Sequence, residues 1–176
     1  MRMRRMLVTM ATALLLLAGS MGLAQADESV PPALAPPAGY TAVLTARATG
    51  VQIYRSTADG AGFKWSLEAP LAELSYAGGV IHHYAGPSWE AADGSKLARD
   101  ASVPVASVPA AHASADIPWL LLKVTADPAP GALAKVGFVQ RIATQGGVAP
   151  AQPPVRAGTL VGVPYTATYV FYARPD

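Results

Sequence analysis

Cysteine and asparagine are both missing from the 176-residue sequence. Without cysteine the chain can form no disulfide bond, no thiolate metal site and no cysteine nucleophile. Without asparagine it has no acceptor for N-linked sugar and no Asn-Gly hairpin turn. Its stability must therefore come from a hydrophobic core, and a chain of this length can bury one.

Basic residues are scarce except at the very start, where three arginines occur within the first five residues. An apolar run from Met6 to Leu17 follows, and Ala24 to Ala26 reads Ala-Gln-Ala. A positive start, an apolar run and an A-x-A cleavage site together are typical of a secretory signal peptide. The run is too short to span a bilayer comfortably, which needs about 20 residues. We therefore expect residues 1–26 to be removed and the protein to be secreted or periplasmic.

Removal of that segment changes the charge balance of the chain. It takes away three of the 13 Lys and Arg residues, leaving 10 against 11 acidic residues and a formal net charge of −1. Nucleic-acid binding needs a clustered basic face, and the remaining chain has no run of Lys or Arg, so we exclude nucleic acid as a partner. The hydrophobic fraction of 52% includes the signal and many alanines, so we expect no transmembrane segment after cleavage.

The rest of the chain divides into a leader and one domain. Residues 27–39 are rich in proline, which fixes φ and disfavours helix, so they are predicted to form a flexible leader. Residues 40–176 have short runs with β-type composition, separated by Gly and Pro, and no helical period of ordinary length. The predicted strands are Tyr40–Arg47, Val51–Ser56, Phe63–Leu67, Val80–Tyr84, Ser88–Ala91, Val103–Val108, Trp119–Thr125, Lys135–Thr144 and Thr159–Ala173. Residues 69–76 are compatible with a helical turn or a strand. The pattern predicts a single all-β domain, an antiparallel β-sandwich or barrel.

Several motifs occur in an order that resembles a known family. They are Trp65 with Pro70, Ala72 and Leu74, HYAGPSWE (83–90), DGS (93–95), IPWLL (117–121), QRIATQGGVAP (140–150) and VPYTATYVFY (163–172). From about Gly50 onward the chain is similar to the secreted family catalogued as domain of unknown function 3455. The resemblance implies a class with no assigned activity. Many members carry cysteines where this chain has residues 55–56 and 154–157, so any disulfide between those places is lost here.

The stretch from Gly78 to Ser95 has the highest density of groups that can do chemistry. His82, His83, Glu90 and Asp93 are ligand types for zinc or copper. Adjacent residues of a strand point to opposite faces, however, so the two histidines cannot easily share an ion. We therefore predict one histidine inside and hydrogen-bonded, one outside, and neither a metal nor a cofactor.

Catalysis is an alternative use of the same stretch. His83, Glu90 and Asp93 are candidate acid and base groups for hydrolysis of a glycan or an ester. Glycoside hydrolysis depends on a carboxyl separation of roughly 5 to 9 Å, which a sequence does not give. Acyl transfer by Ser88 lacks the G-x-S-x-G turn that presents such a nucleophile. Solvated loop carboxylates and tryptophans in the core are the simpler interpretation.

Arg141 is the remaining candidate, in the polar run that precedes Gly146 and Gly147. It can pair with Glu90 or Asp93 across the sheet, or it can bind an anion, and the salt bridge is the prediction. Taken together, the sequence favours a non-catalytic binding or envelope-associated module for a small molecule or glycan. Its predicted ligand-binding residues are His83, Tyr84, Trp89 and Arg141; the alternative is a hydrolase of glycans or esters.

Overall fold

The computed structural model describes residues 29–175, so the predicted signal peptide lies outside the described residues. Within that range the chain forms nine strands and one turn of 3-10 helix, η1. Their bounds are η1 (Pro32–Leu34), β1 (Thr41–Asp59), β2 (Gly62–Tyr76), β3 (Gly79–Tyr84), β4 (Ser88–Ala91), β5 (Lys96–Arg99), β6 (Ala106–Val108), β7 (Trp119–Ala126), β8 (Val136–Gly146) and β9 (Leu160–Ala173). No helix in this range is both long and apolar enough to cross a membrane.

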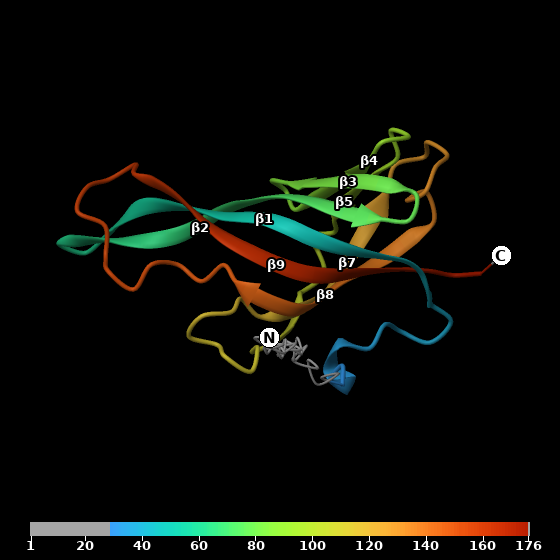
Figure 1. Cartoon of the computed structure of the whole chain (residues 1–176), viewed down its shortest axis with the longest axis horizontal. Helices are drawn as coiled ribbons and strands as arrows, with labels where there is room; N and C mark the ends of the chain where they lie inside the picture. Colours follow the sequence, from blue (N-terminus) through green and yellow to red (C-terminus); the bar gives the residue numbers. More distant parts are fainter. Residues whose placement is uncertain (1–28, 176) are drawn as a thin grey trace, which may run out of the picture.

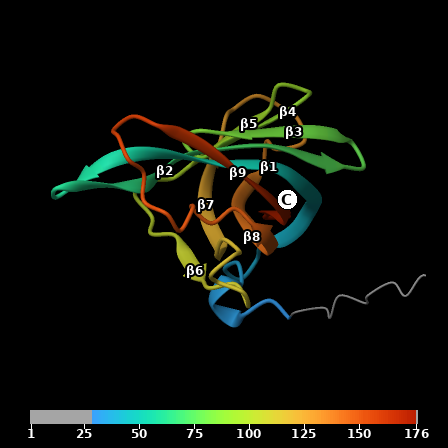
Figure 2. The same cartoon turned by 60° about the vertical axis from the view of Figure 1, so that its left-hand side comes forward.

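All nine strands belong to one antiparallel sheet in the order β5-β4-β3-β2-β1-β9-β8-β7-β6. The sheet closes on itself because β5 also pairs with β7, from Leu97 opposite Ala126 to Arg99 opposite Val124. Figure 2 shows β1, β7 and β8 curving around the interior of this ring. The predicted all-β, antiparallel class is confirmed, and the architecture is a single sheet that closes into a ring.

The hydrophobic core lies inside the ring. Alternate residues of each strand face inward, as expected for a pleated sheet with one buried face. The inner faces of β1, β2 and β9 carry many small residues, such as Ala48, Ala72 and Ala167, which leave room for large ones. The largest fully buried side chains include those of Trp89, Tyr169, Phe171, Leu74 and Ile81.

Strands β1 and β2 are longer than predicted. The sequence predicts a break between two strands at Ala-Thr-Gly (48–50) and allows a helical turn or a strand at residues 69–76, but both segments lie in continuous strands. Glycine is needed at position 50 by close packing, since an added Cβ would lie 2.2 Å from the carbonyl oxygen of Leu71. Pro70 is tolerated because β3 pairs with β2 only from Ala72 onward, so β2 has a free edge at that proline. The far end of this hairpin extends away from the ring (Figure 1).

The leader was predicted to be flexible, yet its residues Pro32–Leu34 pack against the outer face of the sheet. Leu34 is completely buried and belongs to a second hydrophobic cluster with Trp119, Leu121 and Ala110. The side-chain amide Nε2 of Gln140 donates to the Leu34 carbonyl oxygen at 2.7 Å. Strand β7 is therefore covered on both faces, which explains its nearly continuous apolar sequence.

Candidate functional site

His83 and Trp89 form the centre of a cluster of polar and aromatic side chains inside the ring. They lie opposite each other on β3 and β4, and their rings stack with centroids 4.5 Å apart and planes 8° apart. The ring of Tyr169 on β9 meets the edge of both, with centroids 5.4 Å from His83 and 6.3 Å from Trp89. His83 is 3% exposed, whereas His82 is exposed on the outer face. The prediction of one buried, hydrogen-bonded histidine and one exposed histidine is confirmed.

The hydrogen bonding of His83 fixes its tautomer, and its burial favours the neutral form. Its Nδ1 lies 2.8 Å from the carbonyl oxygen of Ser88, and because a carbonyl only accepts, Nδ1 carries the proton. The pKa of His83 is lowered to about 4 mainly by burial; the Ser88 hydrogen bond opposes this change, and the positive charge of Arg141 adds a smaller lowering effect. At neutral pH the imidazole is therefore uncharged, with Nε2 as its acceptor atom.

Arg141 also lies inside the ring, on β8. It follows the buried Val139 by two residues and is opposite Tyr169 on β9, so it shares the inner face with both. The side chain is 9% exposed, and its Nε and Nη2 both donate to the Pro118 carbonyl oxygen, at 3.3 and 2.9 Å. Its charge partly opposes the rise in pKa that burial imposes on Tyr54 and Tyr165.

The predicted salt bridge from Arg141 to Glu90 or Asp93 is wrong. Glu90 alternates with the inward-facing Trp89 and Ala91, so it projects from the outer face, where its Oε1 lies 3.2 Å from Lys96 Nζ. None of the ion pairs found in residues 29–175 involves Arg141. A buried guanidinium without a carboxylate is unusual, because burying an unpaired charge is costly.

Several buried side-chain polar atoms lack a hydrogen-bond partner within the described chain. They include the side-chain amide nitrogen of Gln52, the hydroxyl of Ser56 and the indole nitrogen of Trp89. Gln52 is close to Tyr165, since an added Cβ on Gly147 would lie 3.0 Å from Tyr165 Cβ and 3.3 Å from Gln52 Cγ. Buried polar groups are normally satisfied, so these atoms mark a part of the core that apolar packing does not explain.

A pocket opens at the surface beside the cluster that contains Arg141. We call it the Pro118 pocket; its volume is about 380 Å³ and its wall is formed mainly by Tyr54, Ala110, Ala113, Ile117, Pro118 and Val148. The hydroxyl of Tyr54 donates to the Gly147 carbonyl oxygen at 2.6 Å, which fixes the ring at the pocket wall. Arg141 lies behind this wall, joined to it through the Pro118 carbonyl. The pocket thus borders on the buried cation.

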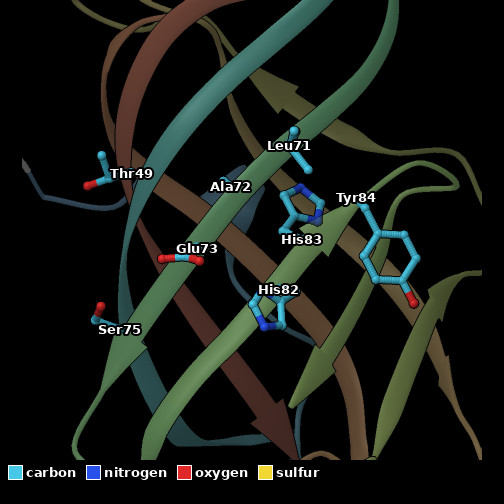
Figure 3. A pocket seen from close by; sticks show the side chains of 8 residues that line it. All are labelled: Thr49, Leu71, Ala72, Glu73, Ser75, His82, His83 and Tyr84. Atoms are coloured by element: carbon cyan, nitrogen blue, oxygen red, sulfur yellow. The ribbon is translucent and has the colours of Figure 1, made fainter. Parts of the chain in front are cut away.

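The outer face of β1, β2 and β3 carries a second hollow of about 420 Å³ (Figure 3). Glu73 and His82 are opposite each other on neighbouring strands and lie side by side in it, with Thr49 and Ser75 beside them. Tyr84, a predicted ligand-binding residue, is on its border and donates from its hydroxyl to Glu90 Oε2 at 3.0 Å. The buried His83 also lines this hollow, although adjacent residues of β3 project from opposite faces, so the Tyr84 side chain does not join His83, Trp89 and Arg141 inside the ring.

Asp93 has a local role in the turn between β4 and β5. Its Oδ1 accepts from the amide and the hydroxyl of Ser95, at 3.0 and 2.6 Å, and its Oδ2 accepts from the amide of Ala132 at 2.7 Å. These hydrogen bonds, that of the Ser95 hydroxyl first, lower the pKa of Asp93. The carboxylate thus joins the turn to the loop before β8.

The three catalytic candidates are not assembled into one site. Glu90 is across the sheet from His83, Asp93 is bound to Ser95 and Ala132, and neither affects the pKa of His83. The Ser88 group that meets His83 is its carbonyl, which is no nucleophile. Within residues 29–175, no three His, Asp or Glu side chains converge as metal ligands.

Sequence reasoning missed Gln52, Tyr54, Tyr165 and the Pro118 carbonyl as parts of this centre. The alternation of Gln52 and Tyr54 on β1 indicates a common face, but not that this face is buried against β8. The carbonyl of Pro118 carries no side-chain signal at all. The Gly146-Gly147 pair was a usable signal, because both glycines have positive φ and bring the backbone close to Tyr165.

The fold and the site define an all-β protein whose closed sheet holds a buried polar centre beside a small surface pocket. The family model described as protein of unknown function (DUF3455) matches residues 75–173, more than half of the chain, and the chain belongs to this family. The resemblance seen in the sequence motifs is thereby confirmed. No curated protein and no solved structure matches the chain.

Proposed function

We propose that the protein is a non-catalytic binding module that takes a small molecule in the Pro118 pocket. The observation that carries the proposal is Arg141, a buried cation that donates to the carbonyl oxygen of the pocket-lining Pro118 and forms no ion pair within residues 29–175. Buried charges that are not needed for stability are concentrated at functional sites, where stability is given up for binding.

The character of the pocket supports this proposal. Small-molecule sites are typically concave, about 300 to 1,000 Å³ in volume, and mostly apolar with a few polar groups. The Pro118 pocket is within that range at about 380 Å³, and alanine, proline, valine and isoleucine dominate its wall. Its polar groups are few, the hydroxyl of Ser107 and the side chains of Tyr54 and Asp116 among them.

The test is a ligand screen against a variant with a filled pocket. Ala113 lines the pocket from an exposed loop, so Ala113→Trp fills the space without entering the core. Ala115 is exposed in the same loop and does not line the pocket, which makes Ala115→Trp the matched control. Fragments that bind the native protein in ligand-observed NMR should lose binding to Ala113→Trp and keep it with Ala115→Trp. Equal binding to both variants, or no binding fragment in a chemically diverse library, would contradict the proposal.

We also propose that the module acts outside the cytoplasm, in the periplasm or beyond the cell. The support is the sequence of residues 1–26, which combines a basic start, an apolar run and Ala24-Gln25-Ala26. The mature protein should then begin at Asp27. Intact mass of the protein recovered from its producing cells tests this, and a full-length mass in the cytoplasmic fraction would contradict export.

A further inference from the structure

Strand β2 has an unpaired edge along the half that extends away from the ring (Figure 1). On one side β2 pairs with β1 from Gly62 to Ser75, but on the other side β3 pairs with it only from Ala72 onward. Within residues 29–175, no loop contributes a backbone hydrogen bond to residues 62–71. The backbone donors and acceptors on this side of β2 therefore face no other strand. Such an edge is a template on which a further strand can pair.

Apolar side chains are exposed along this edge. Leu67 is 59% exposed, and Leu71 is 56% exposed further along the same strand. Trp65 is half-buried, and its indole Nε1 donates to the Gln152 carbonyl oxygen at 2.9 Å. Trp65 and Leu67 are two residues apart, so both project from the same face of β2. A strand that pairs with this edge therefore meets an apolar pair beside it.

The charges of this edge are arranged symmetrically about Ser66. Lys64 precedes Ser66 by two residues, and Glu68 follows it by two residues. Lys64 shares the face of Ser66 by alternation along the strand. Glu68 shares it too, because its carboxylate accepts from Arg55, which is opposite Ser66 on β1. Both charges stay accessible: Lys64 Nζ lies 3.6 Å from Asp59, and the side chains of Lys64 and Glu68 are 56% and 36% exposed.

We propose that this edge pairs antiparallel with the same edge of a second copy of the chain, about a two-fold axis at Ser66. Ser66 is then opposite Ser66 of the second copy. Each Lys64 is opposite a Glu68, and each Trp65 is opposite a Leu67, because the two members of each pair are equally far from Ser66. The two-fold arrangement thus forms two ion pairs and two apolar pairs between the copies. This dimer does not depend on a ligand in the proposed pocket.

Two features that usually protect an edge strand are consistent with this pairing. Charged side chains, lysine above all, disfavour edge-to-edge association because like charges meet. Here each lysine meets a carboxylate of the other copy, which favours this antiparallel register over shifted ones. Pro70 lies just beyond the paired segment and has no N–H group, so it ends the ladder. A two-fold contact uses the same edge in both copies, so assembly stops at two chains.

Charge exchange between two variants tests the register. The ladder is short, so the native protein should dimerise weakly, with a dissociation constant of about 0.1 to 1 mM from its translational diffusion measured by NMR. Lys64→Glu and Glu68→Lys each place like charges opposite each other twice, and each should weaken dimerisation about tenfold. An equimolar mixture of these two variants should dimerise like the native protein, because every charge then meets its opposite. Arg47→Glu is the control, since it makes the same charge change on β1, which is paired on both sides.

A single introduced thiol tests the geometry, because the chain has no cysteine of its own. Directly opposite residues of antiparallel strands have Cα atoms about 4.5 to 5.5 Å apart, within reach of a disulfide bond. Ser66→Cys should therefore cross-link between copies on mild oxidation with diamide. Lys64→Cys is the control, since residue 64 is displaced by four residues, about 13 Å, from its own counterpart across the contact. Lys64→Cys and Glu68→Cys should cross-link with each other when mixed, but neither should do so alone.

Each outcome decides on the dimer. A native protein that stays monomeric up to about 2 mM overturns the proposal. So does a Ser66→Cys variant that cross-links no faster than Lys64→Cys. A dimer that Lys64→Glu leaves intact places the contact elsewhere, and mixed charge variants that stay monomeric overturn the register. Diffusion of the native protein and cross-linking of Ser66→Cys involve no change of charge, so they decide the question even where a charge variant fails to fold.

Discussion

Single residues inside the ring combine roles that are usually separate. His83 stacks on Trp89 as an aromatic core residue does, and it also stays neutral near the cation Arg141. A protonated imidazole there would place a second positive charge in a region that holds no carboxylate partner for the first. The fold therefore selects the uncharged histidine, and its stability depends on pH through this residue.

We predict that stability declines as the pH falls from about 6.5 to about 4. His83 has a pKa of about 4 in the folded state and 6.5 as its ordinary value, so in this window only the unfolded chain gains the proton. Stability thus rises with pH, and the difference of about 2.5 pH units corresponds to about 3 kcal/mol in the free energy of unfolding. Urea unfolding across the window measures it.

The variant His83→Phe should flatten this dependence, because it keeps the stacking on Trp89 and removes the titrating group. His82→Gln is the control, since His82 is exposed on the outer face and its removal should leave the slope in place. A slope that persists in His83→Phe would show that other groups carry it. The carboxylates whose pKa values are lowered, Asp93 among them, lose their contribution only at lower pH.

The sequence was sufficient for the placement of His83 but not for the partner of Arg141. Alternation along a strand puts His82 and His83 on opposite faces whatever the rest of the fold is. The neighbour of Arg141 depends instead on which strands pair. Strand β8 pairs with β9 and β7 and not with β4, which carries Glu90, and the two residues are on opposite faces of the sheet.

At the scale of elements, the turn between β4 and β5 is joined to the loop before β8 by side chains. Asp93 accepts from the Ala132 amide at 2.7 Å, and the Ser95 hydroxyl accepts from the Leu133 amide at 3.2 Å. Leu133 is completely buried and belongs to the main core. Two short polar residues thus hold a core residue in place from a loop.

We predict that Asp93→Ala releases this loop. The amides of Ala132 and Leu133 should exchange with solvent faster, and the free energy of unfolding should fall, because the two segments lose their shared acceptor. Since the pKa of Asp93 is lowered in the fold, its contribution is present above the pH at which an unfolded Asp ionises. It is lost as the pH falls through the folded-state value.

Hydrogen exchange followed by NMR is the measurement, with Asp59→Ala as the matched control. Asp59 is also a turn-proximal aspartate, but it is exposed at the tip of the β1–β2 hairpin, 3.6 Å from Lys64 Nζ, where an ion pair contributes little. Unchanged exchange at Ala132 in Asp93→Ala would contradict the role assigned to the carboxylate.

Elements were predictable in type more than in extent. The predicted strand Thr159–Ala173 matches β9 (Leu160–Ala173) closely, because its content of β-branched and aromatic residues is high. Strand β5 (Lys96–Arg99) was not predicted, since four residues with one buried leucine carry no periodic signal. The sequence predicts a break at Gly50 because the structural reason for this glycine, the close approach of β2, is a long-range contact that the local pattern does not show.

At the scale of the whole molecule, the closed ring leaves the outer face of β7 and β8 to be covered by another segment. Residues before β1 do this, with Leu34 packed among Trp119, Leu121 and Ala110. Ala110 also lines the Pro118 pocket, so the leader and the pocket share a wall. The leader therefore supports the proposed binding site as well as the sheet.

We predict that Leu34→Ala lowers the free energy of unfolding by about 2 to 5 kcal/mol, the usual range for a fully buried leucine. Val30→Ala is the control, since Val30 is in the same leader but 40% exposed, and it should change stability by less than about 0.5 kcal/mol. Urea unfolding at neutral pH compares them. Because Ala110 lies in both the cluster and the pocket, Leu34→Ala should also weaken binding of any ligand that Ala113→Trp displaces. Equal stability of Leu34→Ala and the native protein would mean that the leader only rests on the sheet and that the ring keeps its pocket without it.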